Sequence, residues 1–197
     1  MIDASTALQL LLDAQRLKRT LRTGWVMRGV PDAESVADHS FGVAFISLLL
    51  GEMTQQPLDK VKLLTIALLH DLPESVIGDL PTPARIHFPP DAKRKAETNV
   101  LNELLGELPP PSAERWCSWW QEFEQGTSIE GQIVRDADRL DMLIQAHVYE
   151  QTTGNQWLKE FWPSLEDRPF KFPAARMLYE ELDALYRQSN DAGEYHV

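Results

Sequence analysis

The residues most suited to chemistry are two histidines that each stand beside an aspartate. His39 follows an aspartate in "ADHS", and His70 precedes Asp71 in "LLHDLP". Imidazole nitrogens and carboxylate oxygens are ligands that divalent first-row cations accept together. These residue types therefore point to a divalent metal site with nitrogen and oxygen ligands.

The first histidine belongs to a helix whose start is marked in the sequence. Ser35 and Asp38 have the spacing of a capping box, which predicts a helix that begins near Val36 with His39 in its first turn. Apolar residues then recur at steps of three or four, which places His39 on the core-facing side. The residues of this face are Val36, His39, Val43, Ile46 and Leu50.

The second histidine lies at the end of the next predicted helix. Leu63, Ile66 and His70 share one face of that helix. Pro73 limits the continuation of regular helix, so we expect His70 and Asp71 where a C-terminal turn opens. Two core-facing imidazoles thus come from consecutive helices.

A third helix is predicted over residues 131–148, and aspartates interrupt its apolar face. Asp138 and Asp141 flank the core stripe and either one can point inward, whereas Asp136 falls to the other side. A buried carboxylate without a partner is costly, so an inward one needs a cation. Periodicity leaves the choice between Asp138 and Asp141 open. The stripe itself consists of Ile133, Ala137, Leu140, Ile144 and Val148.

The alternative for each histidine is a hydrogen-bonded core residue, which is the commoner role on an apolar helix face. The conjunction of His39 and His70 with acidic neighbours favours the metal interpretation. Solvated loops or helix surfaces are expected for the other three histidines, which are His87, His147 and His196.

Helical signals run along nearly the whole chain, and strand signals are almost absent. Proline or glycine beside a capping residue marks boundaries at "PDAES", "QQPLD", "PTP", "FPPD", "LPPPS", "QGTS" and "FPA". We expect about seven helices, an all-α fold, a single domain over residues 1–197, and a frayed end at residues 188–197. Packing against the core or a partner subunit is expected for Trp116, Trp119 and Trp120.

Composition disfavours several classes of protein. The chain has 30 acidic and 19 basic residues, and this formal charge of -11 opposes binding to nucleic acid or to anionic membrane surfaces. We find no apolar run near the roughly 18 residues of a membrane span and no secretory leader. Cys117 is the single cysteine and cannot form an internal disulfide. We expect a cytoplasmic protein.

Longer stretches resemble a known family. They are "RTGWVMRGV" (22–30), "ESVADHS" (34–40), "LLHDLPESVIGDLPTP" (68–83) and "VRDADRLDMLIQAHVYE" (134–150). The order His39, His70-Asp71, Asp138 resembles the H…HD…D signature of the HD-domain metal-dependent phosphohydrolases, an all-helical superfamily. The flanking residues resemble its 5'-deoxynucleotidase branch. The resemblance implies hydrolysis of deoxyribonucleoside 5'-monophosphates to deoxynucleoside and phosphate by a homodimer with one divalent cation per subunit.

The resemblance also implies a ligand set. It assigns His39, His70, Asp71 and Asp138 to the metal, and it leaves Asp141 beside the ligands or merely buried. Four protein ligands on a six-coordinate ion leave two positions for substrate and water. Mn²⁺, Co²⁺, Fe²⁺ or Mg²⁺ suit that geometry better than Zn²⁺, which favours four-coordinate sites but stays possible.

Roles in catalysis follow from the same resemblance. Glu74 matches the catalytic carboxylate, which orients or deprotonates the attacking water. Asp79 is expected to protonate the leaving 5'-oxygen. The substrate loop that the resemblance implies consists of Asp79, Leu80, Pro81 and Thr82.

The segment before the first ligand helix departs from the family in one position. Trp25 falls where the family stacks on or screens the sugar, and core packing is its alternative role. Some members have arginine immediately before this tryptophan, whereas this chain has Gly24. The residue that matches the family's phosphate-binding arginine is therefore not fixed by position, and the candidates are Arg22 and Arg28.

Two other functions are compatible with these residues. An HD-domain hydrolase of a phosphodiester or a nucleoside polyphosphate would share the four ligands, but it would need a longer basic groove. A non-catalytic protein with a structural or sensing metal would not need Glu74 and Asp79, and both are present.

Overall fold

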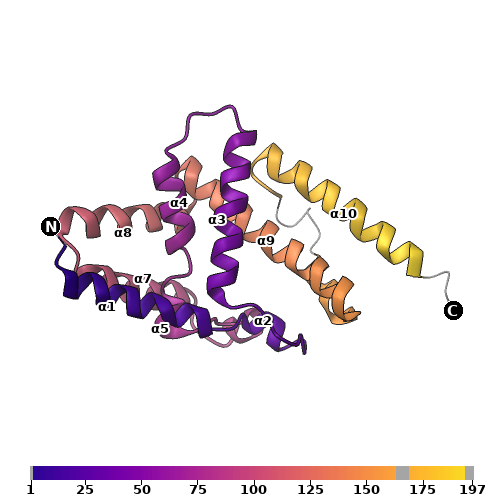
Figure 1. Ribbon diagram of the computed structural model, residues 1–197, viewed down its shortest axis with the longest axis horizontal. Coiled ribbons are helices and arrows are strands. Elements are labelled where there is room, and N and C mark those ends of the chain that lie inside the picture. Colours follow the sequence, from indigo (N-terminus) through magenta and orange to yellow (C-terminus); the bar gives the residue numbers. More distant parts are fainter. Residues whose placement is uncertain (1, 163–168, 194–197) are drawn as a thin grey trace.

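The computed structural model describes residues 2–162 and 169–193, and these residues form helices without any strand (Figure 1). The all-α prediction is therefore confirmed. The long helices are α1 (Ala4–Ala14), α3 (Val36–Met53), α4 (Lys60–Leu69), α7 (Ala92–Gly106), α8 (Pro110–Gln125), α9 (Ile129–Thr153) and α10 (Pro173–Gly193). The short ones are α2 (Thr23–Val26), α5 (Glu74–Ile77), α6 (Thr82–Arg85) and the 3-10 helices η1 (Gln15–Arg19) and η2 (Gln156–Phe161). The prediction of about seven helices matches the number of long helices among the described residues, and the short helices come in addition to it.

Helix α3 begins where the sequence predicts. The Ser35 hydroxyl accepts the Asp38 N–H at 3.2 Å, and the Asp38 carboxylate accepts the Ser35 N–H at 2.9 Å. This reciprocal pair satisfies two backbone donors that a helix start leaves open. The predicted inner face of α3 is buried along its length, from Val36 through His39 to Leu50.

Helix α3 stands at the centre of the molecule, with α4 and α9 packed against it (Figure 1). The main hydrophobic cluster lies where these helices meet, and α8 and α10 add side chains to it. A second cluster joins α7 and α8 to the N-terminal helix and contains the buried Trp120, with Trp116 packed against it. The three helices on which the sequence places histidines and aspartates are thus brought together.

The predicted core stripe of α9 is correct only in its first half. Ile133, Ala137 and Leu140 are buried, whereas Ile144 and Val148 are exposed. The buried face differs there because the second half of α9 also packs against η2 and the segment around Trp25. In that half the core side chains are Leu143 and Ala146.

Helix α3 is, within the described part of the chain, the one helix long and apolar enough to cross a membrane, although no such run was expected. Its inner face packs into the main cluster, as the central helix of a bundle does.

Helix α10 continues to Gly193, so residues 188–193 are helical. Residues 194–197, including His196, lie outside the described residues, and fraying there stays a prediction.

Candidate metal centre and active site

The two predicted histidines face each other inside the bundle. His39 lies in the first turn of α3, and His70 follows the last residue of α4. Both are buried, and their Nε2 atoms lie 3.4 Å apart. The sequence prediction that both imidazoles face the core is confirmed.

Hydrogen bonds at the far side of each ring set its tautomer. His70 Nδ1 lies 2.7 Å from the carbonyl oxygen of Ala67, and His39 Nδ1 lies 2.7 Å from Asp141 Oδ2. Because these oxygens accept hydrogen bonds, Nδ1 of each ring carries the proton. When the rings are neutral, both therefore present the lone pair of Nε2 to a common point, which is the arrangement of two metal ligands.

Two carboxylates lie beside the point to which the two Nε2 atoms are directed. Asp138 Oδ1 lies 3.2 Å from His39 Nε2, and Asp71 Oδ2 lies 3.3 Å from His70 Nε2. Adjacent ligands of an octahedral ion with bonds of about 2.1 Å lie about 3.0 Å apart. His39, His70 and Asp138 offer ligand atoms within 4.8 Å of one another, and Asp71 lies beside both histidines, so the structure brings together all four residues that the resemblance implies as ligands. It also separates the two candidates on α9, because Asp138 approaches Nε2 of His39 and Asp141 approaches Nδ1.

The charges around the cluster of two histidines and two aspartates favour a positive charge at its centre. Burial and Arg22 lower the pKa of His39, but hydrogen bonds to Asp138 and Asp141 outweigh them and raise it to about 10. Burial raises the pKa of Asp71, but His70 and Arg22 outweigh it and hold that pKa well below its usual range. The cluster thus holds its carboxylates ionised and attracts either a proton or a cation.

Arg22 and Asp79 border this cluster. Arg22 Nη1 lies 3.4 Å from Asp71 Oδ2, and its side chain is largely buried. Asp79 Oδ2 accepts the Thr23 N–H at 2.6 Å, and the Thr23 hydroxyl donates to the Asp79 carbonyl at 2.8 Å. Gly78, with φ 75°, makes the turn that returns the chain from α5 to this contact. The predicted substrate loop is thereby tied to the segment that carries Arg22.

Glu74 is a buried carboxylate with an incomplete set of partners. Its Oε1 lies 3.4 Å from Lys93 Nζ, and its Oε2 has no hydrogen-bond partner. Burial, followed by the charges of Asp71 and Asp79, raises the pKa of Glu74 to about 8. A carboxylate in this state can hold or accept a proton near neutral pH, as a general base or acid requires.

Trp25 and Arg28 point away from the cluster. Trp25 is 2% exposed, its Nε1 donates to Glu34 Oε1 at 2.8 Å, and its ring packs against Phe161 and Tyr149. Arg28 lies over the Phe161 ring and donates to the Gly24 carbonyl at 2.8 Å. The structure therefore favours the packing role that the sequence left open for Trp25, and it places Arg22 rather than Arg28 beside the ligands.

Replacing Trp25 by alanine is expected to lower the free energy of unfolding by about 3–5 kcal/mol, as truncation of a buried tryptophan does. Urea denaturation measures this loss, and Trp157→Ala is the control because Trp157 is 76% exposed. The ratio of kcat/KM for a deoxynucleotide to that for its ribonucleotide should stay unchanged. A narrowed ratio would contradict the packing role and favour the sugar-screening role instead.

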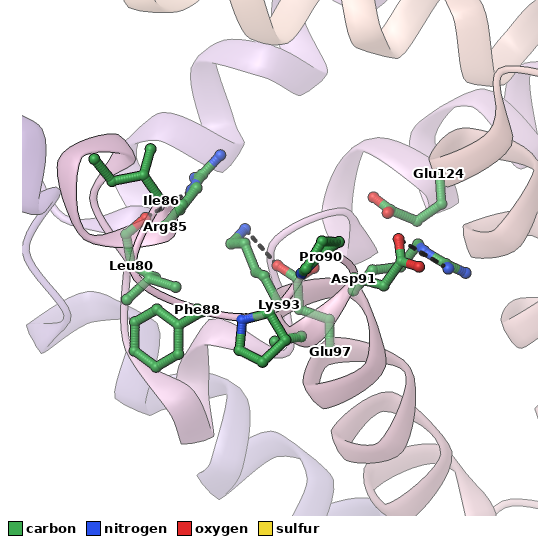
Figure 2. Close-up of a pocket in the computed structure, with 12 residues that line it drawn as sticks. Leu80, Arg85, Ile86, Phe88, Pro90, Asp91, Lys93, Glu97 and Glu124 are labelled. Atoms are coloured by element: carbon green, nitrogen blue, oxygen red, sulfur yellow. Dashed lines mark hydrogen bonds and ion pairs between the residues drawn. The ribbon is translucent and has the colours of Figure 1, made fainter.

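One residue of the predicted substrate loop borders an open pocket of about 590 Å³ (Figure 2). Leu80 lines the pocket, while Pro81 is half-buried and Thr82 is exposed at the start of α6. Lys93 lines the same pocket and pairs with both Glu74 and Glu97. The pocket therefore joins the substrate loop to the side chain that holds Glu74.

Sequence reasoning missed two residues that support this site. Lys93 pairs with Glu74 across two helices, and nothing in its local sequence indicates that contact. Trp120 donates its indole N–H to the His70 carbonyl at 3.1 Å, so it holds the backbone of a candidate ligand. Its helical spacing predicted burial, which is confirmed, but not this partner.

Comparisons with known proteins agree with this geometry. Residues 14–168 match the family model described as "HD domain". The chain is 33% identical to "5'-deoxynucleotidase HDDC2" of Bos taurus, over 96% of this chain and 90% of the relative. It is 33% identical to "5'-deoxynucleotidase YGK1" of Saccharomyces cerevisiae, over 78% of this chain and 71% of the relative.

Solved structures give the same relationship. A conserved hypothetical protein from Pyrococcus furiosus superposes with a TM-score of 0.76 at 41% identity, covering 91% of this chain and 99% of that chain. A protein from Pyrococcus horikoshii OT3 superposes with a TM-score of 0.76 at 37% identity, covering 91% and 98%. The chain therefore belongs to the HD-domain family, in the branch whose curated relatives are 5'-deoxynucleotidases.

Proposed function

We propose that this chain hydrolyses deoxyribonucleoside 5'-monophosphates to deoxynucleoside and inorganic phosphate, with one divalent cation bound by His39, His70, Asp71 and Asp138. The observation that carries the proposal is the convergence of two Nε2 lone pairs and two carboxylates near Glu74, whose buried Oε2 has no partner. The names of the curated relatives support the substrate class.

The side chains have distinct roles in this proposal. A cation held by these four residues would polarise a phosphate oxygen and lower the pKa of a water molecule. Arg22 binds the phosphate oxygens through charge-assisted hydrogen bonds. Glu74 orients the attacking water and accepts its proton, while Asp79 gives a proton to the leaving 5'-oxygen. Leu80, Pro81 and Thr82 border the substrate.

The proposal also covers the setting of the enzyme. We propose Mn²⁺, Co²⁺, Fe²⁺ or Mg²⁺ as the cation, because oxygen-containing sites with six ligands suit them. We further propose one domain over residues 1–197, in the cytoplasm, without a nucleic-acid or membrane partner. The charge of -11 supports the last point.

Release of inorganic phosphate tests the activity. Metal-stripped protein is incubated with matched ribo- and deoxyribonucleoside 5'-monophosphates, with each cation added separately and deoxyribonucleoside 3'-monophosphates as controls. We expect release from the 5'-deoxy substrates only when a cation is present. Equal release from ribonucleotides, or none from any monophosphate, would contradict the proposal.

Replacing Arg22 by methionine is expected to lower kcat/KM by about 10–100-fold, the range of a hydrogen bond between charged groups. Most of the change should be a higher KM, since the guanidinium binds phosphate in the ground state as well. Steady-state kinetics at saturating cation measure it, with Arg28→Met as the comparison. A larger loss in Arg28→Met would reverse the choice between the two arginines.

We propose that the enzyme is a homodimer and that an exposed stripe on α3 contacts the second copy. The stripe consists of Phe41, Phe45, Leu49 and Met53, and the rings of Phe41 and Phe45 stack with parallel planes. Four apolar side chains in one row of a helix are typical of an interaction surface. This supports the homodimer implied by the family resemblance.

Charge placed in this stripe is expected to abolish the dimer. The double substitution Phe41→Asp with Phe45→Asp should give a monomer by light scattering, because a buried carboxylate without a partner opposes association. Leu11→Asp on α1 is the control, since Leu11 is exposed outside the stripe. A mass unchanged from that of the unsubstituted protein would exclude the α3 stripe as the interface.

A further inference from the structure

We propose that Asp141 is a positioning residue for His39 and that Gly42 provides the space in which its carboxylate lies. The inference rests on the proposed metal centre, in which His39 Nε2 is a ligand. It adds a function for two residues that are not ligands themselves.

The contact geometry supports a positioning role. Asp141 Oδ2 lies 2.7 Å from His39 Nδ1, which is the ring nitrogen opposite the ligand atom. The Asp141 side chain is 13% exposed, so water competes little for this bond. A carboxylate behind a ligating imidazole fixes the tautomer and ring orientation and makes the other nitrogen a better ligand.

Gly42 is the residue that makes this contact possible. It lies one turn after His39 on α3, where α9 packs against it. A Cβ at Gly42 would overlap Asp141 Oδ1 and would lie 2.8 Å from Asp141 Cγ. Any side chain at position 42 must therefore displace the Asp141 carboxylate. The requirement for glycine here is one of close approach, not of backbone conformation.

A second cation between Glu34, His39 and Asp141 is the competing interpretation, since these residues offer atoms within 4.8 Å of one another. The hydrogen bonds argue against it. Glu34 Oε1 already accepts the Trp25 indole N–H at 2.8 Å. His39 Nδ1 cannot donate a proton to Asp141 and bind a cation at the same time.

Binding of Mn²⁺ alone to metal-stripped protein tests the proposal without any substrate. We expect Gly42→Ala and Asp141→Ala to weaken Mn²⁺ binding by about 10–100-fold, the range for partners of metal ligands. Asp141→Asn should retain the cation with a smaller loss, because its amide oxygen still accepts the Nδ1 proton. This variant preserves volume and keeps the test valid if Gly42→Ala does not fold.

The matched control is Gly51→Ala on the same helix. A Cβ at Gly51 would make ordinary contacts with Leu58 at 3.4 Å and Leu63 at 3.5 Å, so Mn²⁺ affinity should stay within about twofold. In the double variant Gly42→Ala with Asp141→Ala, the carboxylate that the Cβ would displace is gone. Its affinity should therefore equal that of Asp141→Ala alone, since the two residues act through one contact.

A spectroscopic measurement separates positioning from general destabilisation. In the Co²⁺-loaded protein, the Nδ1 protons of His39 and His70 should give two paramagnetically shifted exchangeable proton resonances. Gly42→Ala should remove or shift the His39 signal and leave the His70 signal, which reports the bond to Ala67. A lower melting temperature with unchanged Mn²⁺ affinity and both signals intact would overturn the proposal.

Stoichiometry and activity give independent outcomes. Two Mn²⁺ per chain, with the second lost in Asp141→Asn, would overturn the proposal because Asp141 would then be a ligand. Failure of the unsubstituted protein to release phosphate from any deoxynucleotide would overturn the proposed function alone. Weaker Mn²⁺ binding in Gly42→Ala and Asp141→Ala, with a smaller loss in Asp141→Asn, would still support the positioning role in that case.

Discussion

Replacing His70 by alanine is expected to remove the bound cation and to lower kcat/KM by at least about a thousandfold. The cation contributes several kcal/mol of transition-state stabilisation, and each 1.36 kcal/mol is a factor of ten in rate. The substitution deletes one Nε2 lone pair and leaves His39 facing the carboxylates without the second nitrogen that lies 3.4 Å away. Asp138→Ala should have the same effect, because Asp138 Oδ1 lies 3.2 Å from His39 Nε2, the nitrogen that faces His70.

Two measurements check this result together. Elemental analysis after dialysis against buffered cation gives the metal content, and phosphate release gives the activity. His87→Ala is the control, because His87 is an exposed histidine outside the cluster. Full metal occupancy in His70→Ala would remove His70 from the ligand set.

Replacing Glu74 by glutamine is expected to lower kcat by about 100- to 10,000-fold, the contribution of a positioned general base. The same substitution should stabilise the metal-free protein at high pH. Oε2 of Glu74 is buried without a partner, and its ionisation is opposed by burial and by Asp71 and Asp79. Loss of activity with a gain of stability would separate a functional carboxylate from a structural one.

The pH dependence of this gain has a definite sign. The pKa of Glu74 is raised to about 8 in the folded chain, so the folded state binds the proton more tightly than the unfolded state. Its contribution to the free energy of unfolding therefore falls as pH rises from about 4.5 to about 8. The stability difference between Glu74→Gln and the unsubstituted protein should grow across this window and then level off.

Urea denaturation of metal-free protein at pH 6 and pH 9 measures the difference. Glu107→Gln is the control, because Glu107 is an exposed glutamate at the end of α7. A difference between Glu74→Gln and the unsubstituted protein that does not change with pH would show that Glu74 titrates as in the unfolded chain. Unchanged kcat in Glu74→Gln would exclude it as the general base.

The sequence predicts the helices and the ligand-bearing faces well because both depend on local chemistry. The cap at Ser35 and the spacing of Val36, His39 and Val43 are readable within one helix. Contacts between residues of different helices cannot be predicted from the pattern of one helix. Lys93 meets Glu74, and Trp120 meets the His70 carbonyl, only after separate helices have packed.

The choice between the aspartates of α9 shows this limit most clearly. Asp138 and Asp141 both flank the apolar stripe, and their roles depend on how far α9 is rotated against α3. In the structure Asp141 approaches Gly42 closely, and no helical period encodes this contact. Ile144 and Val148 were misplaced for a similar reason, because α9 changes neighbours along its length.

The origin of the four candidate ligands on three different helices links cation concentration to the folding equilibrium. His39, His70 and Asp138 lie on or at the ends of α3, α4 and α9, which the unfolded chain does not hold together. A cation that binds only the native state stabilises it by mass action, by about 2.7 kcal/mol at a free concentration one hundred times its Kd. Withdrawal of the cation by a chelator therefore shifts the chain toward unfolding as well as toward inactivity. When less metal is available, we expect a larger unfolded fraction of this chain, which is the form that proteases cleave.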